Sequence, residues 1–187
     1  MTTPTHVFLF GPPGSGKSTQ GALLSEHLQI PHFSIGELLR AKAQGDSAEA
    51  LAIAEKMKTG DLVDDSTVYD TLKTHLKSDS TRKGFILDGF PRTEQQIPML
   101  ERLAGELELR DYVALDISVP AEVTRTRLLQ RGRADDTPSV IDARLERYED
   151  TAAPILRYFN KKGKLRVIDG RGDIEQVAKE VRALFEG

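Results

Sequence analysis

The 187-residue chain contains no cysteine and no tryptophan. The lack of cysteine excludes disulfide bonds, thiolate zinc sites, cysteine nucleophiles and iron–sulfur clusters held by this chain. With only 7 Phe and 4 Tyr, an aromatic surface for stacking single-stranded nucleic acid is not expected. The formal net charge is -3, so the overall basic field of a general nucleic-acid binder is missing too. Any polyanionic ligand must therefore meet a local cluster of basic residues.

Long hydrophobic runs are also absent. The longest, such as Val-Phe-Leu-Phe at residues 7–10, have the length of a strand, whereas a membrane span needs about 18 apolar residues. The first six residues show neither the basic nor the apolar region of a signal peptide. We therefore expect no membrane partner and a cytoplasmic location. No apolar seam for self-association stands out, so we expect a monomer.

Strand-like and helix-like segments alternate along the chain. The length suits one domain, residues 1–187, and the alternation predicts an α/β fold with a doubly wound, five-stranded parallel sheet. The predicted strands are residues 7–10, 31–35, 84–88, 113–119 and 165–168. The predicted helices are residues 17–28, 47–58, 65–76, 93–103, 121–130, 139–159 and 174–185. From about residue 36 to residue 78 no strand is obvious, which predicts a helical insertion between two strands.

Residues 11–18 read Gly-Pro-Pro-Gly-Ser-Gly-Lys-Ser and match the phosphate-binding pattern G-x-x-x-x-G-K-[ST]. The motif follows an apolar strand and precedes a helix, as it must. Glycines let backbone amides approach a phosphate closely, and the helix N-terminus faces the same anion. Lys17 is predicted to contact the β- and γ-phosphates. The guanine-reading motif Asn-Lys-x-Asp is absent, because residues 160–163 read Asn-Lys-Lys-Gly, and this argues against a GTPase switch.

Asp88 ends a predicted buried strand and so should lie near the phosphate loop. In a parallel sheet the carboxyl ends of the strands meet at one edge, where ligands bind. Hydroxyl and carboxylate oxygens suit Mg²⁺. We therefore predict Ser18 and Asp88 as ligands of Mg²⁺ bound with ATP, partly through water.

Residues 88–92, Asp-Gly-Phe-Pro-Arg, followed by Gln96, resemble the acceptor motif of adenylate kinases. Together with the phosphate loop, this pair of motifs is close to diagnostic of nucleoside monophosphate kinases. The resemblance covers nearly the whole chain and continues through residues 36–40, 60–63, 131–136 and 151–154. It implies a P-loop NTPase fold and an adenylate kinase with a short lid. Such an enzyme reversibly converts ATP·Mg²⁺ and AMP into two ADP, in adenine nucleotide homeostasis and nucleotide biosynthesis.

The resemblance implies a role for each residue that matches the family motifs. It implies an ATP site at Gly14, Ser15, Gly16, Lys17, Ser18, Thr19, Arg131 and Gly172. It implies an AMP site at Ile35, Arg40, Asp61, Leu62, Val63, Gly89, Phe90, Pro91, Arg92, Gln96, Arg133 and Arg144. The catalytic residues that it implies are Lys17, Arg92, Arg131, Arg133 and Arg144. Arg40 and Arg92 would clamp the AMP phosphate, which suits a bidentate guanidinium, and the amide of Gln96 would read adenine.

Two segments of the single domain also receive roles from the resemblance. Residues 34–63 would form the AMP-binding insertion, and residues 131–137 would form a lid too short for a separate zinc or β-hairpin domain. Asp135 and Asp136 are expected to hold the lid arginines. Arg147 matches no arginine of the family, so we expect it to be solvated.

Two alternatives remain open. Ile35 stands where adenylate kinases usually carry Thr, and pyrimidine nucleotide kinases have an apolar residue there, so one alternative is a CMP/UMP kinase. Gln96 favours adenine, because the pyrimidine enzymes tend to carry Asn. The other alternative is a non-catalytic nucleotide-binding switch. It would need the phosphate loop, but not Arg40, Arg92 and Gln96 together.

Overall fold

The computed structural model describes residues 5–109, 111–133 and 136–186. The strands among these residues form one sheet: β1 (Thr5–Phe10), β2 (His32–Ser34), β3 (Gly84–Asp88), β4 (Val113–Ser118) and β5 (Leu165–Asp169). Every pairing is parallel, and the order across the sheet is β2-β3-β1-β4-β5. The predicted five-stranded parallel α/β fold is therefore confirmed.

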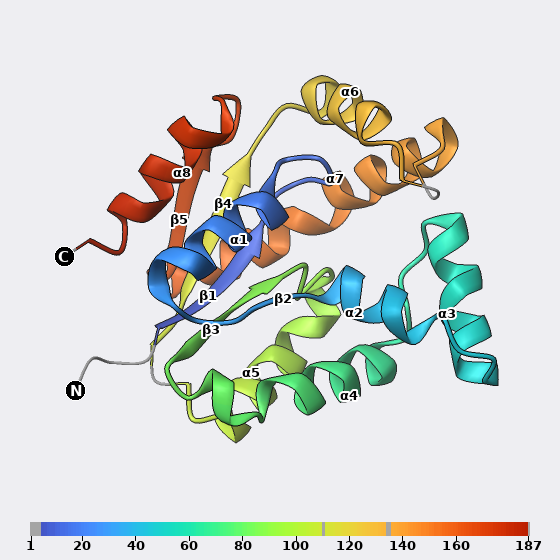
Figure 1. Cartoon of the computed structure of the whole chain (residues 1–187), viewed down its shortest axis with the longest axis horizontal. Helices are drawn as coiled ribbons and strands as arrows, with labels where there is room; N and C mark the ends of the chain where they lie inside the picture. The colour runs from blue at the N-terminus through green and yellow to red at the C-terminus, as the bar shows by residue number, and fades with distance from the viewer. Residues whose placement is uncertain (1–4, 110, 134–135, 187) are drawn as a thin grey trace.

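Helices connect the strands and cover both faces of the sheet (Figure 1). The α-helices of the described part are α1 (Lys17–Leu28), α2 (Ile35–Lys42), α3 (Ala48–Thr59), α4 (Asp65–Leu76), α5 (Ile97–Glu106), α6 (Ala121–Arg131), α7 (Pro138–Lys161) and α8 (Ile174–Ala183). Short 3₁₀ helices, η1 (Asp79–Thr81) and η2 (Glu94–Gln96), lie before and after β3. None of the helices in these residues is long and apolar enough to cross a membrane.

The central strand β1 is buried on both faces, as its continuous apolar run predicts. Phe8 and Phe10 pack in a core with side chains from α4, α5 and α7. Val7 and Leu9 pack in a second core with side chains from α1 and α8. Because successive side chains of a strand point to opposite faces, one short segment anchors both layers of helices. The strand that leads into the phosphate loop is thereby packed between both layers.

Helices α2, α3 and α4 follow one another between β2 and β3, where the sequence predicts a helical insertion. Helix α3 lies at the end of the molecule away from both termini (Figure 1). It ends at Gly60, whose φ of +80° is a left-handed conformation that glycine adopts readily. The prediction of residue 35 as the last residue of a strand is wrong. Ile35 begins α2 instead, because the strand ends at Ser34, which is the N-cap of this helix; the Ile35 side chain, only 1% exposed, packs in the core.

The predicted helix over residues 93–103 differs most from the structure. It begins as η2 and continues as α5 to Glu106. Helix α4 has the predicted bounds, and its N-cap residue is Asp64. The carboxylate of Asp65 has another partner, because it accepts a hydrogen bond from Gln96. The strands keep the predicted order, while α2 is a helix that the sequence analysis placed only within the helical insertion.

Candidate active site

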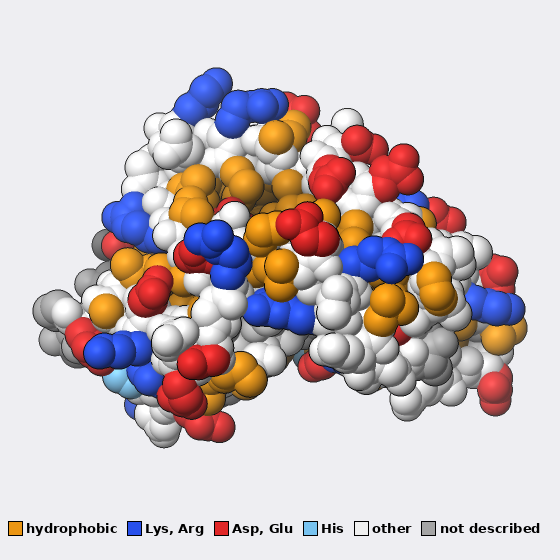
Figure 2. Space-filling model, turned by 90° about the horizontal axis from the view of Figure 1, so that it is seen from above, with side chains coloured by type: hydrophobic (Ala, Val, Ile, Leu, Met, Phe, Trp, Pro, Cys, Tyr) orange, Lys and Arg blue, Asp and Glu red, His pale blue; other side chains and the backbone are white. Residues whose placement is uncertain are grey.

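A pocket of about 210 Å³ opens beside the carboxyl ends of β1 and β3. It is lined by the phosphate loop, the helical insertion, the loop after β3, and α7. Figure 2 looks onto the molecule from above and shows apolar and basic side chains side by side around its middle. The predicted site residues in the lining are Gly14, Lys17, Ser18, Ile35, Arg40, Asp61, Leu62, Val63, Asp88, Gly89, Pro91, Arg92, Gln96, Arg131, Arg133 and Arg144.

A smaller group of predicted site residues does not line the pocket: Ser15, Gly16, Thr19, Phe90 and Gly172. Phe90 is fully buried, and its ring belongs to the apolar core, so its side chain is not available to a ligand. Gly172 lies between β5 and α8. Arg127 holds the start of this connection by donating to the Gly170 carbonyl at 3.0 Å.

The phosphate loop has a backbone conformation that requires glycine. Gly14 and Gly16 have φ angles of +83° and +94°, a region that residues with a Cβ rarely adopt. A Cβ on Gly14 would also lie 2.7 Å from the carbonyl oxygen of Thr124. Helix α1 begins within the motif, at Lys17, so the N–H groups of its first turn are available to an anion.

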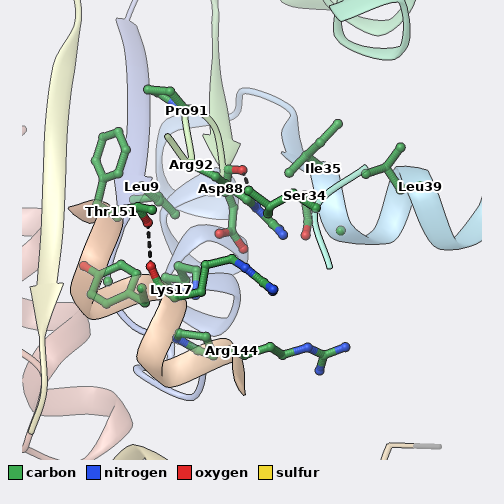
Figure 3. Close-up of a pocket in the computed structure, with 18 of the residues that line it drawn as sticks. Leu9, Lys17, Ser34, Ile35, Leu39, Asp88, Pro91, Arg92, Arg144 and Thr151 are labelled. Carbon is green, nitrogen blue, oxygen red and sulfur yellow. Dashed lines mark hydrogen bonds between the residues drawn. The ribbon is translucent and has the colours of Figure 1, made fainter. Parts of the chain in front are cut away.

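Lys17, from α1, and Asp88, from the end of β3, point into the same part of the pocket (Figure 3). Ser18, also from α1, lines the pocket as well. The Oγ of Ser18 donates to Oδ2 of Asp88 at 2.5 Å, and Asp88 is buried. The Nζ of Lys17 donates to the carbonyl of Pro12 at 3.2 Å. Burial lowers the pKa of Lys17 from its ordinary value, Asp88 opposes that shift, and Arg92 adds to it.

The pair formed by Ser18 and Asp88 fits a magnesium ion. Its hydroxyl and carboxylate are oxygen ligands of the kind that Mg²⁺ prefers, and they lie 2.5 Å apart, close enough to contact one cation. Mg²⁺ is usually held by one or two protein groups, with substrate phosphates and water completing its coordination. These residues therefore suit a cation that arrives with a nucleotide.

Arg40 and Arg92 form a basic cluster on the other side of the pocket. A Cβ added at Gly36 would lie 3.5 to 3.7 Å from Nη atoms of both arginines. The two guanidinium groups therefore converge beside Gly36. The Nε of Arg92 donates to the carbonyl of Gly89 at 2.8 Å. The guanidinium of Arg92 faces the pocket, yet the protein around it lowers its pKa through desolvation, which Asp88 opposes. Two converging guanidinium groups match a phosphate monoester well.

Gln96 lines the pocket although it is only 2% exposed. Its Oε1 accepts from the backbone N–H of Arg92 at 2.7 Å. Its Nε2 donates to Oδ1 of Asp65 at 2.7 Å. A side-chain amide has two acceptor positions and two donor hydrogens. Gln96 therefore retains one acceptor position and one hydrogen for a ligand.

Asp136 holds two of the arginines that line the pocket. Arg131 binds it through two hydrogen bonds of 2.8 and 2.7 Å, and Nη1 of Arg144 lies 3.4 Å from Oδ1. Burial opposes ionisation of Asp136, but Arg131, the backbone N–H of Arg133 and the charge of Arg144 together outweigh it, so the pKa is lowered. The prediction that Asp136 holds lid arginines is confirmed, whereas Asp135 lies outside the described residues.

Arg133 extends from the predicted lid segment to the helical insertion. Its Nη2 lies 3.7 Å from Oε1 of Glu37 in α2. Both side chains are partly exposed, so this contact is weak. It nevertheless shows that the segment after α6 reaches the rim of the insertion.

The expectation that Arg147 is solvated is wrong. Arg147 lines the pocket, donates from Nη1 to the carbonyl of Gly60, and places Nη2 at 2.8 Å from Oδ1 of Asp61. Arg144, one turn earlier on α7, donates to the carbonyl of Met57 at 3.4 Å. Residues three apart on a helix share a face. The spacing of the two arginines indicates that they share a face of α7, but it does not indicate which residues that face contacts.

Tyr148 and Asp116 also lie at the site, and the sequence patterns did not single them out. Tyr148 lines the pocket and donates to Oδ1 of Asp116 at 3.4 Å. Asp116 is buried in β4, and burial raises its pKa, while Tyr148 and Lys17 oppose the shift. A carboxylate within an otherwise apolar strand is the signal that points to it.

Comparisons with known proteins agree with this geometry. The family model described as adenylate kinase matches residues 9–164. A protein named adenylate kinase from Xylella fastidiosa (strain 9a5c) is 38% identical over 180 residues, covering 94% of this chain and 96% of its own. Adenylate kinase 1 from Nostoc sp. is 37% identical over 179 residues, covering 96% and 97%. Adenylate kinase from Xanthomonas euvesicatoria pv. vesicatoria is 39% identical over 180 residues, covering 94% and 96%. The chain therefore belongs to the adenylate kinase family.

Proposed function

We propose that the pocket transfers a phosphoryl group from ATP, bound with Mg²⁺ at the phosphate loop, to AMP bound beside α2 and the loop after β3. As a member of the adenylate kinase family, the chain is an ATP:AMP phosphotransferase, and its substrates are ATP, AMP and ADP. One observation carries the assignment of residues. Lys17 of the phosphate loop and Arg92 of the acceptor motif line the same cavity.

On the ATP side, we assign phosphate binding to the backbone of residues 14–19 and to Lys17. The positive φ of Gly14 and Gly16 and the start of α1 at Lys17 support this assignment. Ser18 and Asp88 would hold Mg²⁺, which when bound neutralises phosphate charge. Gly172 would lie by the ATP base, an assignment that rests on the family resemblance alone.

On the AMP side, we assign the phosphate to Arg40 and Arg92, whose guanidinium groups converge near Gly36. Gln96 would read the base with the hydrogen and the acceptor position that it retains. The base would also contact apolar and backbone groups of the acceptor side. These are Ile35, Asp61, Leu62, Val63, Gly89, Pro91 and the backbone of Phe90.

Phosphoryl transfer of this kind needs positioning and charge neutralisation more than covalent chemistry. Lys17 and Arg92 would hold the donor and acceptor phosphates in line. The arginines that border the space between them would stabilise the charge that spreads over the transferring group. These are Arg131, Arg133 and Arg144. No side chain needs to form an intermediate with the phosphoryl group.

Water beside bound ATP would make the site an ATPase, so the pocket must close before transfer. We assign this closure to the insertion at residues 34–63 and to the lid at residues 131–137. The contact of 3.7 Å between Arg133 and Glu37 supports a lid that meets the insertion. Lid closure in adenylate kinases is itself a standard example of such gating.

We also propose that the enzyme works as a monomer in the cytoplasm. The cysteine-free composition fits a reducing compartment. Size-exclusion chromatography with light scattering tests the monomer, for which a mass of 20.7 kDa is expected. A dimer mass at micromolar concentration would contradict it.

Ile35 brings an apolar surface without a hydroxyl to the acceptor side of the pocket, which favours CMP and UMP as additional acceptors. The deciding experiment offers AMP, CMP, UMP and GMP separately with Mg²⁺ and ATP and measures the diphosphates formed. We expect the highest kcat/KM with AMP. A higher value with CMP or UMP would contradict the proposed preference for AMP. ATP binding without AMP-dependent ADP formation would instead favour a non-catalytic switch.

A further inference from the structure

We propose that Asp65 is a positioning residue that sets which nucleobases the acceptor site accepts, an inference that rests on the proposed reading of the base by Gln96. Asp65 is the first residue of α4, it is exposed, and it does not line the pocket. Its Oδ1 accepts a hydrogen bond of 2.7 Å from Nε2 of Gln96. Any influence of Asp65 on a bound base therefore passes through Gln96.

The partners of Gln96 leave its amide only one orientation. An ionised carboxylate accepts hydrogen bonds and donates none, so Asp65 must face the Nε2 end. A backbone N–H donates and cannot accept, so the N–H of Arg92 must face the Oε1 end. Both bonds measure 2.7 Å, and the side chain is 2% exposed. Turning the amide over would set donor against donor at Arg92 and acceptor against acceptor at Asp65.

A fixed amide orientation distinguishes bases by their hydrogen-bond polarity. Adenine presents an amino donor beside a ring-nitrogen acceptor, and cytosine presents the same pattern. Guanine and uracil present a carbonyl acceptor beside a ring N–H donor, which is the reverse. Guanine has the size of adenine, so size cannot separate the two. The structure therefore assigns to Asp65 and Gln96 the discrimination of AMP from GMP, and leaves AMP against CMP to the size of the pocket.

The test compares kcat/KM for AMP, GMP and CMP at saturating ATP in variants of Asp65. In Asp65→Ala, Gln96 loses one of the two hydrogen bonds that orient its amide. We expect the ratio of kcat/KM for AMP to kcat/KM for GMP to fall about tenfold, which is the discrimination that one good base contact provides. The AMP-to-CMP ratio and the KM for ATP should change by less than about twofold, within ordinary surface effects. In Asp65→Asn, Oδ1 still accepts from Gln96, so most of the AMP-to-GMP preference should return.

The matched control is Asp64→Ala. Asp64 is the neighbouring carboxylate, and it pairs with Lys56 at 2.7 Å rather than with Gln96. This variant should keep the wild-type AMP-to-GMP ratio. The double variant Gln96→Ala/Asp65→Ala should show the ratio of Gln96→Ala alone, because a positioning residue has no effect once the residue it positions is gone. Thermal unfolding of each variant confirms that the fold is intact.

The outcomes separate this inference from the proposed function. A wild-type enzyme that forms no AMP-dependent ADP would overturn the proposed function, and the role of Asp65 with it. An active wild type in which Gln96→Ala lowers the AMP-to-GMP ratio but Asp65→Ala does not would overturn the role of Asp65 alone. The role is also overturned if Asp65→Asn loses as much preference as Asp65→Ala, or if the effect of Asp65→Ala persists without Gln96.

Discussion

Arg147 of α7 and Asp61 of the loop after α3 lie 2.8 Å apart, measured from Nη2 to Oδ1. The same guanidinium donates from Nη1 to the carbonyl of Gly60. The pair joins a helix of the central core to the segment that lines the acceptor side of the pocket. Both side chains are partly exposed, so the pair adds little to global stability. We expect the pair to act instead on the geometry of the proposed acceptor side.

Arg147→Ala is expected to raise the KM for AMP and to leave the KM for ATP unchanged. Exposed ion pairs are worth about 0.2–1 kcal/mol, so an increase of up to about fivefold is expected. Steady-state kinetics with each nucleotide varied in turn measures the two values. Arg157→Ala is the control, since Arg157 is exposed on the same helix and does not line the pocket. An equal rise in the KM for ATP would contradict a role on the acceptor side.

Arg133→Ala is expected to slow phosphoryl transfer far more than it weakens ATP binding. An arginine that reaches the transferring group as the pocket closes acts mainly in the transition state, and its loss costs on the order of 10³-fold. Single-turnover transfer with saturating ATP and AMP measures this step. A rate within about threefold of the wild-type value would point to a solvated loop cation and would move the role to Arg131 and Arg144.

Ile35→Thr is expected to sharpen the preference for AMP over CMP if a hydroxyl at this position contacts adenine. Ile35 is 1% exposed and packs in the core, so the change also introduces a buried hydroxyl. That costs about 1–3 kcal/mol of stability when the hydroxyl lacks a partner. Ile35→Val is the control, because it shortens the side chain without adding a polar group. An unchanged AMP-to-CMP ratio in both variants would make Ile35 a packing residue only.

Several elements of the fold follow from local features of the sequence. The phosphate loop and the strand before it were predictable because each is specified by a local pattern. For the loop this pattern is the spacing of its glycines, and for the strand it is a continuous apolar run. The start of α1 at Lys17 and the strand over residues 84–88 agree with the prediction for the same reason. The element order then requires a parallel sheet, since each strand is followed by a helical crossover.

Contacts between distant segments could not be predicted in the same way. Arg147 meets Asp61, and Gln96 meets Asp65, only because α7 and η2 are brought beside the insertion. A charged residue on a helix surface has the same local pattern whether water or a carboxylate faces it. Phe90 shows a second limit of a local pattern. Its motif suggests a ligand contact, but its ring fills the apolar core.

The stability of the protein is expected to fall in acid partly through Glu106. This carboxylate accepts from Tyr69 at 2.7 Å and pairs with Lys73 at 3.0 Å, and these contacts lower its pKa from 4.5 to about 2. Because the pKa is lower in the folded state, the ionised Glu106 carboxylate stabilises the folded protein. This contribution is fully present above about pH 4.5 and is lost as the pH falls toward 2 and the carboxylate is protonated.

Glu106→Gln removes this titration. The free energy of unfolding of the variant should therefore fall less steeply between pH 4.5 and 2 than that of the wild type. Urea unfolding at several pH values measures the slope. Other paired carboxylates, such as Asp136, leave part of the slope in place. Glu180→Gln, at an exposed position on α8, should keep the wild-type slope. Equal slopes for Glu106→Gln and wild type would contradict the role of Glu106.

The most direct measurement is the rate of ADP formation from ATP and AMP by Lys17→Met, compared with wild type and with Lys179→Met from the exposed surface of α8. Met has a side chain of similar length, so thermal unfolding should be nearly unchanged. Because an ammonium on the transferring phosphates is worth several kcal/mol, kcat/KM should fall by more than about 100-fold. Lys179→Met should keep wild-type activity. A Lys17→Met enzyme that retains more than about a tenth of wild-type kcat/KM, a loss below about 1.4 kcal/mol, would contradict phosphoryl transfer at this loop.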